Sequence, residues 1–251
     1  MIKRPRILLL DLETFPNVAY VWGKYDQNVI KFKQETCLAT YAAKWLDERE
    51  VFAKALPDFP GYKSGSYDDS KLVADLWRLV NEADIIVAHN GDQFDIKVFQ
   101  ARFIFHKLGP PKPFKTIDTK KATKRVARFN SNKLDDLSSL LENEKKIKTD
   151  FELWQNCIDG DPKAWAQMVK YNKKDILLLE KLYLRLRPWI SNHPNFTVVN
   201  RGYCAKCGSK NITYRGFMIT STRRYRRFQC LDCGGWGRNV KCEDAARMTN
   251  G

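Results

Sequence analysis

The sequence predicts a mixed α/β domain followed by a small metal-stabilised β module. Two apolar runs, 6–12 and 84–88, are typical of strands buried on both faces of a sheet. Strand-like segments come first along the chain, and strands then alternate with amphipathic helices. This order indicates a central sheet with parallel strands and helices packed against it. Two Cys-x-x-Cys pairs near the C-terminal end indicate the second module.

The first part of the domain is expected to be rich in strands. After the strand at 6–12, four further strand candidates follow at 18–25, 29–33, 37–43 and 51–56. Tyr25–Asn28 fits a hairpin turn between the first two of these candidates. The stretch 57–67 is rich in Pro, Gly and Ser and is expected to be a loop.

The second part is expected to alternate helices with strands. Residues 69–82 place Leu72, Leu76, Leu79 and Val80 on one helical face. The remaining predicted elements are strand 84–88, helix 96–107, strand 114–118, helix 134–142 and a helical region 162–187, in which Tyr171 marks a candidate break. The sequence His193-Pro194-Asn195 predicts a boundary. We therefore expect a catalytic domain at 1–193, a cysteine module at 200–241 and a C-terminal tail at 242–251.

Bulk composition narrows the class of protein. The 251 residues are 43% hydrophobic, which favours a folded core over disorder. No apolar run is long enough for a transmembrane helix. The apolar run Ile7–Leu10 is too short for a signal peptide and continues into acidic residues. We expect a soluble cytoplasmic protein without a membrane partner.

The net charge of +15 favours a polyanionic partner. Residues 194–251 hold 11 Lys and Arg against 3 Asp and Glu, a net charge of +8, so the smaller part is the more basic per residue. Charge alone leaves a merely solvated surface as an equal alternative. The distribution of the charge favours nucleic acid as the partner. It also indicates that the C-terminal module is one of the places where nucleic acid binds.

Acidic residues occur in three places that a shared site could unite. Asp11 and Glu13 end the first strand and, being two residues apart, point to the same face. Asp95 lies where a loop after the strand 84–88 opens a helix; a simple helix cap is the alternative. Tyr171 and Asp175 are four residues apart, so they share a helix face. The alternative to a functional pair is a half-buried tyrosine beside a solvated acid.

Together these motifs resemble the DEDD exonuclease superfamily, in its tyrosine-bearing branch, which includes the proofreading domains of family B DNA polymerases. The resemblance rests on D-L-E-T at 11–14, N-x-x-x-F-D at 90–95 and Y-x-x-x-D at 171–175, and it covers 6–187. The lesser segments KTIDT (115–119), NKLDDL (132–137) and FELW (151–154) are similar to that lineage as well. The resemblance implies a ribonuclease H-like fold and 3′→5′ release of nucleoside monophosphates.

The resemblance also implies two divalent cations, Mg²⁺ or Mn²⁺, which prefer oxygen ligands. Asp11, Glu13 and Asp175 would hold the ion that activates water. Asp11 would bridge to a second ion supported by Asp95, and Tyr171 would position the attacking water. Two such ions stabilise the attacking and leaving oxygens of an in-line displacement.

Residues near Asp95 are expected to touch nucleic acid. Asn90 and Phe94 are the candidates, with loop shaping as the alternative for Asn90. Asp92 is a less favoured metal ligand than Asp95, because the Phe-Asp pair of the motif points to Asp95. Asp118 is expected to cap the helix that follows it.

The cysteine module is predicted to hold one structural Zn²⁺. Cys204, Cys207, Cys230 and Cys233 form two Cys-x-x-Cys turns 22 residues apart, each followed by glycine. This pattern resembles a zinc ribbon, in which four thiolates stabilise a small β-sheet and leave no open position for catalysis. Cys37 and Cys157 are expected to be ordinary buried thiols.

Between the two cysteine pairs, arginines alternate with aromatic residues in a strand-like run. Arg223, Arg224, Arg226 and Arg227 are expected to bind nucleic acid, with Phe217, Tyr225 and Phe228 available to stack bases. The alternatives are that the aromatics fill the small core, or that the ribbon docks another protein.

These observations lead to a metal-dependent 3′→5′ exonuclease that acts on nucleic acid, with DNA and a single-stranded 3′ end favoured. A DNA polymerase or another replication or repair protein is a candidate partner. A structure-specific endonuclease or ribonuclease on the same fold is one alternative. A nucleic-acid-binding recruiting protein with vestigial acids is another, although all five expected active-site positions are present.

Overall fold

The computed structural model describes residues 5–25, 28–195, 197 and 202–245. The chain divides into two compact units: Arg6–Leu182, and a second that starts at Tyr183. This division falls inside the last long helix, upstream of the boundary expected at His193, because the residues after the helix pack with the cysteine module. Lys206 Nζ, for example, donates a hydrogen bond to the carbonyl oxygen of Pro188.

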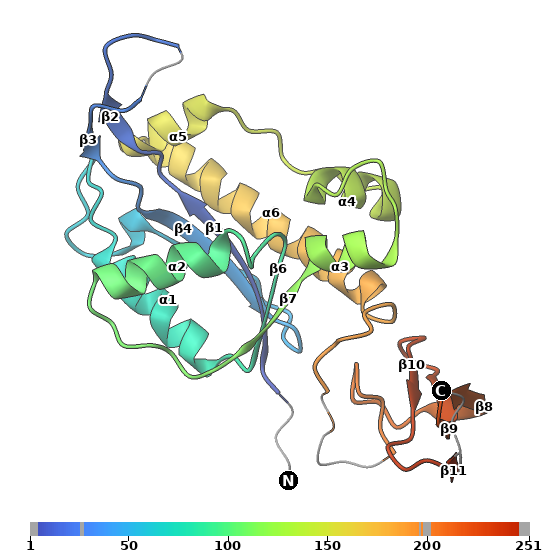
Figure 1. The fold of residues 1–251 in the computed structure, drawn as a ribbon. Helices are drawn as coiled ribbons and strands as arrows, with labels where there is room; N and C mark the ends of the chain where they lie inside the picture. The colour runs from blue at the N-terminus through green and yellow to red at the C-terminus, as the bar shows by residue number, and fades with distance from the viewer. Residues whose placement is uncertain (1–4, 26–27, 196, 198–201, 246–251) are drawn as a thin grey trace. The chain divides into compact units, whose positions relative to one another are not determined.

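The first unit is built on a mixed five-stranded sheet (Figure 1). Its strands are β1 (Ile7–Thr14), β4 (Leu38–Trp45), β5 (Phe52–Ala55), β6 (Ile85–Ala88) and β7 (Lys115–Asp118). They are arranged in the order β5-β4-β1-β6-β7. Strand β1 pairs antiparallel with β4 and parallel with β6, so it lies at the centre of the sheet. The predicted mixed sheet with parallel strands is confirmed.

Helices pack on the two faces of this sheet (Figure 1). Helices α1 (Ser70–Glu82) and α2 (Asp95–Phe105) cover one face, and α6 (Pro162–Leu186) crosses the other. The shorter helical elements are η1 (Leu56–Asp58), α3 (Thr119–Val126), α4 (Leu134–Glu142) and α5 (Phe151–Ile158). None of the helices in the described ranges has the length and apolar character needed to cross a bilayer.

Successive side chains of β1 point to opposite faces of the sheet, so its core residues and its acidic residues lie on different faces. Leu8, Leu10 and Leu12 are buried in a hydrophobic cluster with apolar side chains of α1 and α2. Asp11 and Glu13, which have the opposite parity, point to the face crossed by α6. One strand therefore anchors the core with one set of side chains and presents carboxylates with the other.

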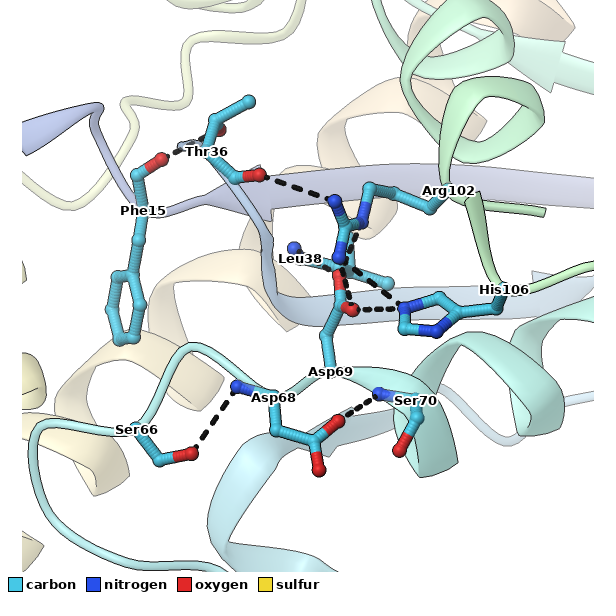
Figure 2. A network of polar contacts seen from close by, with 9 residues as sticks. All are labelled: Phe15, Thr36, Leu38, Ser66, Asp68, Asp69, Ser70, Arg102 and His106. Atoms are coloured by element: carbon cyan, nitrogen blue, oxygen red, sulfur yellow. Dashed lines mark hydrogen bonds and ion pairs between the residues drawn. The ribbon is translucent and has the colours of Figure 1, made fainter. Parts of the chain in front are cut away.

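A buried ionic network joins α1, α2 and the start of β4 (Figure 2). The carboxylate of Asp69 accepts two hydrogen bonds from the Arg102 guanidinium, at 2.8 and 2.6 Å, and one from the backbone N–H of Leu38 at 2.8 Å. His106 Nε2 lies 2.6 Å from the same carboxylate. Asp69 precedes α1, but its side chain does not cap that helix, because these tertiary partners engage it.

A small hairpin, β2 (Val18–Tyr20) and β3 (Lys31–Gln34), separates β1 from β4. Both strands are shorter than the predicted segments 18–25 and 29–33. The expected turn at Tyr25–Asn28 includes residues 26 and 27, which lie outside the described residues.

Helix α6 runs without interruption, so the candidate break at Tyr171 is wrong. Its apolar side chains, such as Met168, Ile176 and Leu179, are buried on both sides of Tyr171 and hold one continuous helix against the sheet. Helix α5, at Phe151–Ile158, was not predicted as a helix. Its two buried side chains, Leu153 and Cys157, leave only a weak periodic signal in the sequence.

The second unit contains a four-stranded antiparallel sheet. It consists of β8 (Ile212–Ile219), β9 (Arg223–Cys230), β10 (Trp236–Arg238) and β11 (Asp244–Ala245). Strand β9 is central and pairs with each of the other three. Strand β11 lies within 242–251, so part of the expected tail is a strand of the sheet. Only two residues pair, too few for a recognisable strand pattern.

Candidate active site

Three carboxylates converge between β1 and α6. One oxygen from each of Asp11, Glu13 and Asp175 lies within 4.8 Å of the others. Asp11 and Glu13 come from the C-terminal end of the central strand, and Asp175 comes from the middle of the helix that crosses it. The structure thus brings together residues that are more than 160 positions apart in the chain.

Asp95 lies beside this cluster at the first turn of α2. Its Oδ1 accepts a hydrogen bond of 3.0 Å from the backbone N–H of Leu12, between the two acidic residues of β1. Its side chain is buried, and its charge acts on the pKa of Asp11. Its oxygens are not part of the group formed by the other three carboxylates. This position suits a residue that supports a second ion near Asp11.

Tyr171 and Lys146 complete the polar surroundings of Asp175. Lys146 Nζ forms an ion pair with Asp175 Oδ2 and lies 3.4 Å from the hydroxyl of Tyr171. The Tyr171 ring packs edge-on against Trp154, with centroids 6.3 Å apart. The hydroxyl is therefore held at the carboxylate cluster by packing on one side and by polar contacts on the other.

Asn172 fixes the orientation of Asp11. This asparagine is fully buried, and its Nδ2 donates to Asp11 Oδ2 at 2.6 Å. Thr40 on β4 donates to its Oδ1 at 3.4 Å. Because Asn172 follows Tyr171 in α6, one helical turn positions the hydroxyl and the Asp11 carboxylate together.

Burial and mutual repulsion weaken the acidity of the cluster. Burial, followed by the charges of Asp95 and Glu13, holds the pKa of Asp11 well above its usual value. Burial and Asp175 raise the pKa of Glu13 to about 8, and burial raises the pKa of Asp95 to about 7. Carboxylates in this situation gain from a cation that compensates their charge.

The donor set fits divalent metal ions. Both carboxylate oxygens of Asp175 are buried, and the Lys146 ammonium and the Tyr171 hydroxyl lie against this carboxylate. Clustered carboxylate oxygens are the ligands that Mg²⁺ and Mn²⁺ prefer. The Lys146 ammonium stands close to the carboxylates that would hold a cation. Burial alone would lower its pKa, but Asp175 and Asp11 raise it.

The loop before α2 is organised by Asp118 at the end of β7. Asp118 accepts hydrogen bonds from the backbone N–H groups of Asn90 and Asp92, at 3.1 and 3.3 Å, and also caps α3, as expected. Asp92 pairs with Lys121 at 2.8 Å and lies outside the carboxylate cluster. Asn90 adopts a positive φ of 67°, which indicates a role in shaping the loop. Phe94 is exposed next to Asp95.

The four cysteines of the second unit form a compact group. Cys204 and Cys233 have Sγ atoms 3.7 Å apart, and those of Cys207 and Cys230 are 3.6 Å apart. A tetrahedron with Zn–S bonds of about 2.3 Å has S–S edges of about 3.8 Å, so the spacing fits Zn²⁺. Burial raises the pKa of Cys207 and of Cys233, so a cation is needed to hold these groups as thiolates.

Two matching turns hold these cysteines. The backbone N–H of Gly208 donates to the carbonyl oxygen of Cys204 at 2.8 Å, and that of Gly234 donates to Cys230 at 2.9 Å. Both glycines have φ of 73°, a conformation that other residues rarely adopt. The four-cysteine cluster thus fits a zinc-ribbon module.

The arginines predicted to bind nucleic acid are exposed on β9. The guanidinium groups of Arg224, Arg226 and Arg227 lie 4.5, 4.6 and 4.7 Å from the ring centroids of Phe217, Tyr214 and Trp236 respectively. The contacts hold flat guanidinium groups on aromatic faces. Arg223 is exposed at the start of the same strand.

Two details of the ribbon differ from the expected surface. Tyr225 and Phe228 are buried, so they fill the module's core and cannot stack bases, whereas Phe217 is exposed. Arg224 also forms an ion pair with Asp244 on β11. That pair reduces the positive charge available on β9.

Sequence patterns did not reveal Lys146 and Asn172. Lys146 belongs to a lysine-rich stretch in which nothing distinguishes it from a solvated side chain. Asn172 is an ordinary polar residue on a helix until its neighbours are known. The only available signal for Asn172 was its position directly after Tyr171.

The five-stranded mixed sheet and its flanking helices form a ribonuclease H-like fold, which is a nuclease-type fold. A family model described as the RNase_H superfamily matches residues 10–187, and the chain belongs to this family. The match covers β1 through α6 and so includes every acidic residue of the cluster. Members of this superfamily are typically nucleases or other phosphodiester hydrolases that use divalent metals. A comparison with curated proteins gives no match.

Proposed function

We propose that the protein is a metal-dependent 3′→5′ exonuclease of the DEDD type, in its tyrosine branch, with DNA as the favoured substrate. The observation that carries the proposal is the meeting of Asp11, Glu13 and Asp175 within 4.8 Å, beside Asp95 and the Tyr171 hydroxyl. Two bound Mg²⁺ or Mn²⁺ ions would supply Lewis-acid stabilisation and lower the pKa of the attacking water.

The side chains of this chain have separable tasks in that reaction. Asp11, Glu13 and Asp175 would hold cations. Asp95, which accepts a hydrogen bond from the backbone N–H of Leu12, would support the second cation. Burial and the neighbouring carboxylates raise the pKa of Tyr171, so the phenol keeps its proton. Tyr171 therefore orients water through its hydroxyl and does not act as the base.

The Lys146 ammonium gives the site a positive charge that can interact with a phosphate of the substrate. It lies at Asp175 and Tyr171, and its pKa is raised. Cations that bind at the carboxylates would release it from its ion pair with Asp175. The freed ammonium can then face a phosphate oxygen of the substrate.

Product analysis tests the proposal directly. The protein is incubated with 5′-labelled single- and double-stranded DNA and RNA, in Mg²⁺ or Mn²⁺, with Asp175→Asn as the matched control. A ladder of labelled products that shorten by one nucleotide at a time from the 3′ end supports an exonuclease. Labelled products cut at internal positions from the start of the reaction would instead favour a structure-specific endonuclease or ribonuclease, and binding without metal-dependent cleavage would favour a recruiting protein.

We further propose that the zinc ribbon holds nucleic acid. The support is the row of exposed arginines on β9, three of which lie on aromatic rings. Docking to another protein is the competing role for such a module. The two roles differ in salt dependence, because phosphate contacts release counterions.

A further inference from the structure

The hairpin of β2 and β3 carries an unusual amount of exposed apolar surface. Its large exposed side chains are Val18, Tyr20, Val21, Trp22, Tyr25, Val29, Ile30 and Phe32. Trp22 is 92% exposed. A contiguous apolar segment of this kind marks a binding surface more often than a solvated loop.

Lysines lie among these aromatic side chains. Tyr20 is directly opposite Lys31 across the two strands, so both side chains point to the same face. Lys24 Nζ lies 5.5 Å from the ring centroid of Tyr25. Residues 18–34 contain three lysines and one aspartate, so the surface is positively charged as well as aromatic.

The hairpin is attached firmly to the strand that carries Asp11 and Glu13. Beyond the last β1–β4 pair, the N–H of Phe15 donates to the carbonyl oxygen of Cys37 at 3.0 Å, and the Thr36 hydroxyl donates to the carbonyl oxygen of Phe15 at 2.6 Å. Val18 is five residues after Glu13, at most about 18 Å along an extended chain. Figure 1 shows the hairpin projecting from this end of β1.

We propose that this hairpin surface binds single-stranded nucleic acid next to the carboxylate cluster. Exposed aromatic rings stack unpaired bases, and lysines between them contact the phosphates. Paired bases are already stacked on one another, so a duplex cannot use the rings in this way. The inference rests on the proposed nuclease function and adds the surface of the fold on which a single strand binds.

Binding by hairpin variants tests this inference without requiring cleavage. Fluorescence anisotropy with a labelled oligothymidylate, without added Mg²⁺ or Mn²⁺, compares the full-length protein with Trp22→Ala and Tyr20→Ala. The matched control is Trp189→Ala, which removes another exposed tryptophan side chain, 68% exposed, from outside the hairpin. Loss of one stacked base should weaken the affinity by at least about 5-fold. The control should bind like wild type.

The lysines give an independent measurement. Lys24→Ala and Lys31→Ala should each reduce the salt dependence of oligothymidylate binding by about 0.7 in the log–log slope. Trp22→Ala should leave that slope unchanged while lowering the affinity. All these side chains are exposed, and circular dichroism checks that each variant keeps the wild-type fold.

Several outcomes overturn the inference. Equal affinity of the aromatic variants and wild type would do so, as would equal loss of affinity for a blunt duplex. Self-association in sedimentation velocity that Trp22→Ala abolishes would show that the occupant is a second copy of the chain. Oligothymidylate binding through the hairpin without metal-dependent cleavage would support this surface and contradict the exonuclease proposal.

Discussion

Asp11 shows how much one side chain depends on its neighbours in this protein. Its carboxylate faces Glu13 and Asp175, accepts a hydrogen bond from Asn172, and has a raised pKa because of burial and like charges. A site with these properties costs stability in the absence of cations and gains stability when they bind. At the residue scale, function and stability therefore respond in opposite ways to the same substitution.

Asp175→Asn is expected to lower nuclease activity by about 10³-fold or more, because one ligand of the cation that activates water is lost. The fold should remain, and the protein without metal should be as stable as wild type or more stable, since repulsion within the cluster is relieved. Cleavage assays in Mg²⁺ and urea unfolding without added Mg²⁺ or Mn²⁺ measure the two effects. Undiminished cleavage would rule out the assigned role of Asp175.

Tyr171→Phe is expected to lower the turnover rate by about 10²-fold and to leave metal binding intact, because only the hydroxyl that orients water is removed. The ring can keep its contact with Trp154. Metal titration by calorimetry and single-turnover cleavage separate the two properties. If the variant cleaves at the wild-type rate, Tyr171 contributes to packing and not to catalysis.

His89, which lies outside the carboxylate cluster, is expected to make the stability of the protein depend on pH. The Asn132 carbonyl can only accept, so Nε2 carries the proton and Nδ1 is left to accept from Thr119. Burial lowers the pKa of His89 to about 4, against an ordinary value near 6.5. Between these values the unfolded chain binds more protons than the folded chain, so stability falls as pH falls from 6.5 towards 4.

The variant His89→Gln isolates this contribution. Urea unfolding at pH 7 and pH 5 should show that wild type loses about 1–2 kcal/mol more than the variant over this interval. The comparison is between the two proteins because His193 also has a lowered pKa, about 4, and contributes in both. Parallel pH profiles would show that His89 is protonated equally well in the folded state.

At the scale of elements, the Asp69 network decides how α1 and α2 meet the sheet. Asp69 is fully buried and binds Arg102 of α2 and the backbone of Leu38 at the start of β4. The network thereby holds together the strand next to β1 and the helix that begins with Asp95. Its integrity supports the elements that carry the acidic residues of the site.

Arg102→Leu is expected to destabilise the protein by about 3–5 kcal/mol, because the buried carboxylate of Asp69 loses its charged partner. The matched control is Lys112→Leu, which breaks the exposed pair with Asp84. That change should cost about 0–1 kcal/mol. Urea unfolding of both variants provides the comparison, and similar losses would mean that burial does not distinguish the two pairs.

At the scale of the whole molecule, the carboxylate cluster and the four-cysteine cluster belong to different compact units. All acidic residues of the cluster lie within Arg6–Leu182, and all four clustered cysteines lie in the unit that starts at Tyr183. Each unit contains its own sheet and buried side chains. This organisation predicts that removing the second unit would weaken nucleic-acid binding and leave catalysis in the first unit intact.

Removal of 200–251 is therefore expected to leave a folded, metal-competent nuclease that binds nucleic acid more weakly. If Arg223, Arg224, Arg226 and Arg227 all contact phosphates, the salt slope of binding should flatten by about 3. Single-turnover cleavage at saturating enzyme should change little. The truncated protein must first be shown to be monodisperse, because residues 183–195 lose their contacts with the ribbon, including Lys206 with Pro188.

Identical salt slopes for full-length and truncated protein would show that the ribbon does not hold the substrate. A protein-docking role would then be favoured. Zinc removal by a chelator provides a second comparison, since the four thiolates stabilise the ribbon only while the metal is bound. The chelated protein should then behave like the truncated one in the same titration.

Local sequence patterns determine much of this fold. Near-continuous apolar runs placed β1 and β6, because these strands are buried on both faces of the sheet. Amphipathic patterns placed the helices α1, α4 and most of α6. The spacing of Cys204, Cys207, Cys230 and Cys233 indicated a zinc site, since four thiolates in two turns have few other uses. Asp11, Glu13, Asp95, Tyr171 and Asp175 were singled out by motif and order.

Tertiary structure alone decided which side chains meet. Lys146 joins Asp175, Asn172 joins Asp11, and Arg102 joins Asp69 across long stretches of sequence, and no local periodicity encodes such contacts. The burial of Tyr225 and Phe228 likewise depends on the pairing of β8 with β9. Sequence specifies local geometry and apolar faces, whereas packing fixes the dielectric environment and the partners of each charge, and these set the chemistry of the site.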